Sequence, residues 1–169
     1  MKTNNPFPKK ADAVIIGGGI SGLSIAWHLA KKGMKHIVIL EKSYLGSGAT
    51  GRCGAGIRQQ WSTKANCLMA KKSIEVFEKA ENTLAYEGSI EFKQEGYLIA
   101  ASDELESIAF KDNIALQNAL GISSIMLSKK EAKKIVPHLN TNIIHSAAFC
   151  PTDGHLNPFT TLDPFIRQP

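Results

Sequence analysis

The chain has 169 residues, enough for one domain with a substantial core or for one domain and part of a second. Hydrophobic residues make up 43% of it and charged residues 21%, a composition that excludes an intrinsically disordered chain. The formal net charge is +5, and the basic residues are mostly lysines without a nucleic-acid motif or a run of aromatics beside them. We therefore expect solvated lysines on helix faces and no nucleic-acid partner.

The three cysteines form no CxxC pair and have no metal-ligand spacing with the five histidines. This pattern predicts no metal site and favours a reduced, cytoplasmic protein. Residues 13–30 carry no Asp, Glu, Lys or Arg and follow Lys9 and Lys10, as a signal peptide or a membrane anchor would. Because four glycines in that run would weaken a membrane helix, we expect no membrane span.

The first part of the chain has the pattern of a parallel strand–helix–strand unit. Residues 1–10 are polar and indicate a loose leader, and the apolar, β-branched run 13–16 predicts a parallel strand buried on both faces. Apolar residues recur at helical spacing over 20–32, and Gly33 is placed to end that helix. A second buried strand is predicted at 37–40, and such crossovers are almost always right-handed.

Further along, residues 43–56 are so rich in glycine that no regular structure is expected there. A helix is predicted to begin after Ser62 and Thr63. Two short apolar runs, 90–92 and 97–101, flank a glycine-containing turn and predict a β-hairpin. Antiparallel structure is therefore expected to replace the parallel unit.

The remaining segments alternate between helix and strand signals. Capping boxes predict the starts of two helices, over 103–120 and 128–136. A strand is expected at 143–149 and a turn at 151–154, whereas no helix or strand is expected in the last stretch.

Residues 17–22 match the pattern GxGxxG between the first strand and the helix, and Glu41 follows the second strand about 20 residues later. Gly17 permits a tight turn, Gly19 lets a pyrophosphate approach the backbone, and Gly22 lets the helix pack closely on the strand. Glu41 can accept hydrogen bonds from ribose hydroxyls and would repel a 2′-phosphate. The pattern predicts a bound dinucleotide, against the alternative of a plain glycine turn with a surface glutamate, and does not separate FAD from NAD.

The segment after Glu41 favours FAD. In nicotinamide dehydrogenases the second strand usually continues into another helix and strand, whereas here residues 43–61 form a long glycine-rich arm. Such an arm is suited to lying along an extended cofactor with backbone contacts.

Several stretches of the sequence resemble a known family. The stretches GSGATGRCGAGIRQQW, GYLIAASDELE, LSKKEAKKIVPHL and PTDGHLNPF are similar to the amino-terminal part of FAD-dependent amine oxidoreductases of the D-amino acid oxidase superfamily. The nearest group is the sarcosine oxidase beta subunit, with glycine oxidase, dimethylglycine dehydrogenase and the L-proline dehydrogenase beta subunit. The resemblance runs from about residue 11 to residue 159.

The resemblance implies an α/β fold, a Rossmann-like FAD-binding unit followed by the start of an α+β substrate domain with antiparallel strands. It divides the chain into a leader (1–10), part of the FAD-binding domain (11–85), part of the substrate-binding domain (86–150) and a return segment (151–169). Because family members are considerably longer, we expect this chain to be incomplete. Pro164 is expected to obstruct the helix that relatives begin in the return segment.

The resemblance also implies where FAD binds. The cofactor-binding positions would be Gly17, Gly18, Gly19, Ile20, Ser21 and Gly22 at the pyrophosphate, Glu41 at the adenosine ribose, Lys42 beside the adenine, Gly48, Ala49, Thr50 and Arg52 along the phosphates and ribityl chain, and Gly56 and Ile57 beneath the isoalloxazine ring. The arm holds no histidine, and Cys53 is interpreted as a small packing residue. Non-covalent FAD is therefore expected.

The implied activity is oxidation of the C–N bond of a small amino acid or N-methyl amino acid by hydride transfer to flavin. Arg58 matches the position from which relatives hold the substrate carboxylate, and the alternative is a surface ion pair. The resemblance also implies a possible hetero-oligomer with other oxidase or dehydrogenase subunits. Two other functions stay open, a non-catalytic dinucleotide-binding fragment or pseudo-subunit and an NAD-dependent dehydrogenase. For this chain alone we expect weak or absent FAD and no turnover.

Overall fold

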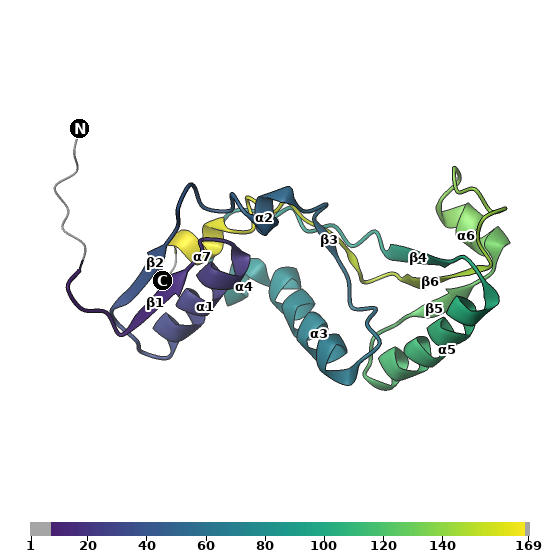
Figure 1. The fold of residues 1–169 in the computed structure, drawn as a ribbon, viewed down its shortest axis with the longest axis horizontal. Coiled ribbons are helices and arrows are strands. Elements are labelled where there is room, and N and C mark those ends of the chain that lie inside the picture. The colour runs from purple at the N-terminus through teal and green to yellow at the C-terminus, as the bar shows by residue number, and fades with distance from the viewer. Residues whose placement is uncertain (1–7, 168–169) are drawn as a thin grey trace.

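The computed structural model describes residues 8–167, so most of the expected leader lies outside the described residues. The chain forms two groups of elements joined by long connections (Figure 1). One group holds the first two strands with the first and last helices, and the other holds a three-stranded sheet with two helices. The long helix α3 (Lys64–Glu78) lies between them.

The predicted strand–helix–strand unit is present. Strand β1 (Ala13–Ile16) pairs in parallel with β2 (Ile37–Leu40), and helix α1 (Ile20–Lys31) crosses between them. The helix ends where predicted, because Gly33 has a φ of +92° and takes the left-handed conformation that glycine favours.

The prediction that both faces of these strands are buried is wrong for the described residues. Exposure alternates along β1, and Val14 and Ile16 are 58% and 88% exposed, next to Leu40 at 41% on β2. The opposite face carries Ile39, which packs against the cluster that includes α1. One face of the sheet is therefore covered and the other is an apolar surface.

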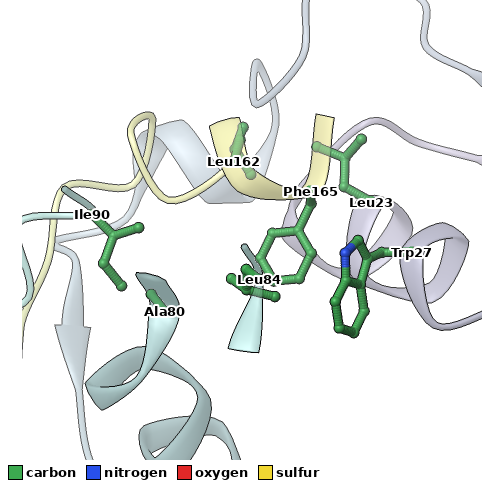
Figure 2. Close-up of a cluster of buried hydrophobic side chains, with 7 residues drawn as sticks. All are labelled: Leu23, Trp27, Ala80, Leu84, Ile90, Leu162 and Phe165. Atoms are coloured by element: carbon green, nitrogen blue, oxygen red, sulfur yellow. The ribbon is translucent and has the colours of Figure 1, made fainter. Parts of the chain in front are cut away.

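The main core cluster joins segments that are far apart in the sequence (Figure 2). Leu23 and Trp27 of α1 meet Leu162 and Phe165 from the end of the chain, and the Trp27 and Phe165 rings lie edge to face with centroids 6.1 Å apart. Ala80, from the one-turn helix α4 (Ala80–Thr83), is buried in the same cluster together with Leu84 and Ile90.

The expectation that the last stretch lacks regular structure is also wrong. Residues Gly154–His155 form strand β7, and Asp163–Arg167 form helix α7. Pro164 does not obstruct this helix, because it lies in the first turn, where no intrahelical bond needs its missing N–H group. Its side chain is instead fully buried.

The second group contains an antiparallel sheet of order β4-β6-β5, made of Tyr97–Ala101, Ser146–Cys150 and Ile125–Leu127. Helices α5 (Glu104–Ala119) and α6 (Lys129–Ile135) pack on it. The strand predicted at 143–149 is confirmed with a later start, while β5 was not predicted.

The predicted hairpin between residues 90–92 and 97–101 is wrong. Tyr97–Ala101 pairs with Ser146–Cys150 instead, and Lys93 bridges to His155 of β7. The φ of Glu91 is +56°, which interrupts any strand through residues 90–92. Ile90 is buried in the main core cluster and Phe92 packs against it, so burial in that cluster outweighs local pairing.

The arm contains two short regular elements, against the expectation of none. Ala49–Arg52 form the single helical turn α2, and Gly56–Ile57 form strand β3, which pairs antiparallel with β7. These elements depend on contacts with distant segments, which local glycine content does not reveal.

The helix starts follow the predicted caps with one difference. Thr63 caps α3, and Ser128 with Glu131 forms the predicted capping box of α6. At α5 the box is shared between two residues, because Asp103 accepts from the Glu106 N–H group whereas the Glu106 carboxylate accepts from Ser102.

The exposed face of the β1–β2 sheet predicts self-association of the isolated chain. Replacing Ile16→Thr keeps a β-branched residue on the strand and removes apolar surface, so the variant should associate less. Sedimentation velocity over a range of protein concentrations measures this. The matched variant Ile39→Thr changes the covered face, and it should lower the thermal midpoint instead. Equal association of the wild type and Ile16→Thr would refute the prediction.

Candidate functional site

The glycine loop lies at the carboxyl end of β1 and leads directly into α1. The φ of Gly17 is +108°, and its N–H group donates to the Leu40 carbonyl oxygen at 2.8 Å. A Cβ at Gly22 would collide with the Gly17 carbonyl oxygen, so a side chain there would push α1 away from the loop. Two glycines of the motif are therefore required by the turn itself.

Glu41 lies beside this loop. Its carboxylate accepts hydrogen bonds from the Gly18 N–H group at 2.8 Å and the Ser43 N–H group at 3.0 Å. The bond from Gly18 is the main cause that lowers the pKa of Glu41, so the loop favours the ionised form of this side chain. Lys42 follows as an exposed side chain. An acceptor with a negative charge is thus held next to the glycine loop.

The arm folds back over the start of α1. The Thr50 Oγ1 atom accepts from the Ile20 N–H group at 3.0 Å, and the Gly46 N–H group donates to the Gly18 carbonyl oxygen at 2.9 Å. Residues 48–52 therefore lie against the glycine loop, although they are separated from it by a strand and a helix.

The loop and the arm leave space of the kind that a phosphate group needs. No described atom lies within 4 Å of the position that a Cβ would take at Gly17 or Gly48. Gly19 is the N-cap residue of α1 and has no side chain to cap the helix, whose amide groups and dipole favour an anion at this end. These residues fit the diphosphate of a dinucleotide.

A cavity of about 680 Å³ extends from the first turn of α1 to the end of the arm. Ile20 and Ser21 line one side, while Gly56, Ile57 and Arg58 line another, and α3 supplies a third wall. The ionisable lining residues are Arg58, His28 and Lys72, with no aspartate or glutamate among them. The cavity therefore suits a ligand with an anionic group.

Arg58 is held over the ring of Trp61, with its guanidinium carbon 4.5 Å from the ring centroid. None of the ion pairs among the described residues involves Arg58, which argues against the surface ion pair considered from the sequence. Trp61 was not predicted as a site residue. An aromatic three residues after an arginine is too common a pattern to indicate stacking without the fold.

The structure brings the predicted residues together in two places. The glycine loop, Glu41 and Thr50 meet at the start of α1, while Gly56, Ile57 and Arg58 line the cavity beside it. Arg52 is exposed at the end of α2 and does not line the cavity.

Two further properties concern the described residues as a whole. No helix within residues 8–167 is both long and apolar enough to cross a membrane. In the same part of the chain, no group of three or more His, Cys, Asp or Glu side chains is arranged to hold a metal ion.

Comparison with known proteins identifies the class of this fold and site. The family model described as FAD dependent oxidoreductase (DAO) matches residues 12–168. The chain belongs to this family. The resemblance noted from the sequence is thereby confirmed, and with it a dependence on FAD.

Individual relatives agree with this assignment. The chain is 32% identical to human mitochondrial dimethylglycine dehydrogenase over 95% of its own length and 18% of that protein. It is 33% identical to the sarcosine oxidase subunit beta of Rhodobacter capsulatus over 80% of its length and 33% of that subunit. The crystal structure of L-proline dehydrogenase from P. horikoshii is 41% identical with a TM-score of 0.81, covering 94% of this chain and 41% of that one. The chain thus spans less than half the length of these proteins.

Replacing Gly19→Val should abolish binding of FAD and of ADP. Gly19 has extended backbone angles that valine also adopts, so the expected damage is steric, at the phosphate side of the loop and at its contact with the arm. A Cβ there would lie 2.9 Å from the Thr50 hydroxyl oxygen. Calorimetric titration of a full-length enzyme that carries this segment with both nucleotides measures the loss, because weak or absent FAD binding is expected for this chain alone. Gly54→Val is the control, because a Cβ at Gly54 meets nothing within 4 Å. Unchanged affinity of Gly19→Val would rule out the loop as the phosphate site.

In the same full-length enzyme, replacing Glu41→Ala should weaken FAD binding about tenfold or more, because a charged acceptor for ribose hydroxyls is lost. The loss should depend on the ribose hydroxyls. The wild type should prefer ADP to 2′-deoxy-ADP, and the variant should bind the two equally. If the variant keeps the wild-type preference between these nucleotides, Glu41 does not contact the ribose.

Proposed function

We propose that this chain supplies the FAD contacts and one substrate contact of a flavoenzyme that oxidises the C–N bond of a small amino acid or N-methyl amino acid. The observation that carries the proposal is the cavity that extends from the first turn of α1 to Arg58. A group that lies along the glycine loop and continues into this cavity would end beside the guanidinium. The names of the dimethylglycine, sarcosine and L-proline relatives support this substrate class.

We assign the cofactor contacts from the family resemblance and from the position of the arm against the glycine loop. The β1–α1–β2 unit acts as a Rossmann-like half, with residues 17–22 at the pyrophosphate, Glu41 at the adenosine ribose and Lys42 beside the adenine. Residues 48–52 follow the phosphates and the ribityl chain, and 56–57 lie beneath the flavin ring. The contacts of the arm with the glycine loop, and the cavity beside that loop lined by Gly56 and Ile57, support this assignment.

FAD is held without a covalent bond in this proposal. The Cys53 thiol donates to the Thr50 carbonyl oxygen at 3.0 Å, so it is engaged within the turn of α2. Residues 43–61 contain no histidine that could attach the flavin.

Arg58 binds the substrate carboxylate and orients the amino acid. Its planar fork suits two parallel hydrogen bonds to a carboxylate, and no acidic side chain in the cavity lining competes for it. Stacking on Trp61 limits the rotation of the guanidinium, which reduces the entropy lost when substrate binds. FAD, when bound, would supply the acceptor for the hydride equivalent from the carbon next to the nitrogen, and Arg58 would position that carbon.

The organisation around this site is part of the proposal. Residues 11–85 form the nucleotide-binding part and 86–150 part of the substrate-binding domain, with 151–169 returning to the first. That return is supported by the packing of Leu162 and Phe165 against α1. The relative named as a subunit supports a hetero-oligomer with other oxidase or dehydrogenase subunits, and the free cysteines support a cytoplasmic location.

Arg58→Lys tests the carboxylate role in a full-length enzyme that carries this segment. Lysine keeps the charge and loses the fork, so KM for the amino acid should rise about tenfold or more while FAD content stays the same. Dye reduction driven by sarcosine, glycine, dimethylglycine or L-proline measures turnover, and flavin absorbance measures FAD content. Arg167→Lys, the same change outside the cavity, is the control. Unaltered kinetics of Arg58→Lys would exclude the role, and amine oxidation without flavin would exclude the proposed function.

A further inference from the structure

Asp153 is a buried carboxylate that faces the segment just after Arg58. It is 0% exposed and precedes strand β7 directly. Its Oδ1 atom accepts from the backbone N–H group of Gln59 at 2.9 Å and from the Gln59 side chain at 3.2 Å. Its Oδ2 atom accepts from the Gln60 side chain at 3.1 Å. These partners lie more than 90 residues earlier in the sequence.

The carboxylate has neutral partners only. No ion pair among the described residues involves Asp153, and burial raises its pKa despite the hydrogen bonds from Gln60 and Gln59. A buried carboxylate without a cation costs folding free energy, and an apolar residue would fill the same space more favourably. A role in packing alone does not account for this side chain.

The Asp153 carboxylate helps to fix the orientation of the Gln60 side-chain amide. Its Nε2 atom donates both to Asp153 and to the Tyr97 carbonyl oxygen, the latter at 2.8 Å. Its Oε1 atom is buried without a hydrogen-bond partner in the described part of the chain. The two acceptors therefore fix one amide orientation, even though an oxygen stays unsatisfied.

Contacts before and after Arg58 leave its backbone little freedom. Immediately before it, Gly56–Ile57 pair with Gly154–His155, the two residues that follow Asp153. Immediately after it, Gln59 and Gln60 are held by the Asp153 carboxylate. The same turn of the chain thus holds Arg58 from both sides.

Hydrogen bonds also fix Trp61, the residue whose ring stacks with the Arg58 guanidinium. The Trp61 N–H group donates to the Gln59 carbonyl oxygen at 2.8 Å, and the indole Nε1 donates to the Arg58 carbonyl oxygen at 3.2 Å. The Gln117 side chain donates to the Trp61 carbonyl oxygen at 2.9 Å. A shift of residues 59–60 would therefore move the ring against which Arg58 is stacked.

We propose that Asp153 is a positioning residue: it holds Gln59 and Gln60 so that the Arg58 guanidinium stays stacked on Trp61 and faces the cavity. It does not touch the substrate, and it acts through the backbone of the Arg58–Trp61 segment. An effect of Asp153 on amino acid binding rests on the proposed carboxylate role of Arg58. An effect of Asp153 on the order of the Arg58 side chain does not depend on that role.

The variant Asp153→Asn isolates this role because it keeps the shape of the side chain. Asparagine has one acceptor and one donor group, so it can serve Gln59 or Gln60 but cannot accept from both. With its oxygen toward Gln59, its amide would oppose the Gln60 Nε2 group that already donates to Tyr97. We expect a folded protein whose Arg58 segment is loosened.

The first measurement is the order of the Arg58 side chain in the ¹⁵N-labelled chain. The heteronuclear NOE of the Arg58 Nε–Hε pair should fall in Asp153→Asn towards the value of the exposed Arg167. The control is Ser146→Ala, which removes another buried hydrogen bond, from Ser146 to Ser107 at 2.8 Å, and should leave Arg58 unchanged. If Asp153→Asn does not fold, Gln60→Leu removes the Gln60 hydrogen bonds to Asp153 and Tyr97, leaves those of Gln59, and should give the same loss of order.

The second measurement is titration with sarcosine and L-proline, followed at the Arg58 and Trp61 side-chain resonances and as KM in the full-length enzyme. Asp153→Asn should weaken binding about tenfold and raise KM without changing FAD content. Wild-type order of Arg58 in both Asp153→Asn and Gln60→Leu would overturn the inference. If Asp153→Asn loosens Arg58 while Arg58→Lys has wild-type affinity for these amino acids, the inference stands and the proposed carboxylate role fails.

Discussion

The pairing of β3 with β7 is the contact on which the site depends, since it joins residues 56–57 to residues 154–155 across more than half of the chain. Loops closed over such distances are costly in entropy, so this pairing needs other contacts to hold it. The Asp153 carboxylate and the bridge from Lys93 to His155 lie at either side of it. Arg58 owes its place to this junction and not to the glycine loop.

The main core cluster also holds the end of the chain against its beginning (Figure 2). Leu162 and Phe165 follow the β7 strand and pack on Leu23 and Trp27 of α1, the helix that begins at the glycine loop. Burial of each of these large side chains contributes roughly 1.5–3 kcal/mol to the free energy of unfolding. The proposed cofactor loop and the proposed substrate arginine are thus tied together by one apolar cluster and one strand pair.

Local signals in the sequence were sufficient for the parts of the fold that depend on neighbouring residues. The β1–α1–β2 unit, the glycine turn with Glu41 after it and the Ser128 capping box all have short-range patterns with a physical cause. Other features depend on contacts between distant segments. They are the β4–β6 pairing, the formation of helix α7 around Pro164 and the stacking of Arg58 on Trp61. A single sequence holds no periodic signal for such contacts, and the hairpin prediction was wrong for this reason.

The two carboxylates near the site show how burial decides the outcome of similar hydrogen bonds. Glu41 and Asp153 both accept from N–H groups, yet the pKa of Glu41 is lowered and that of Asp153 is raised. Glu41 lies near solvent, so its hydrogen bonds stabilise a charge that remains hydrated. Asp153 has lost its hydration, and its neutral donors do not replace it. The half-buried Glu41 is therefore suited to receive the hydroxyls of a ligand, whereas the fully buried Asp153 is suited to hold two segments of the protein in one arrangement.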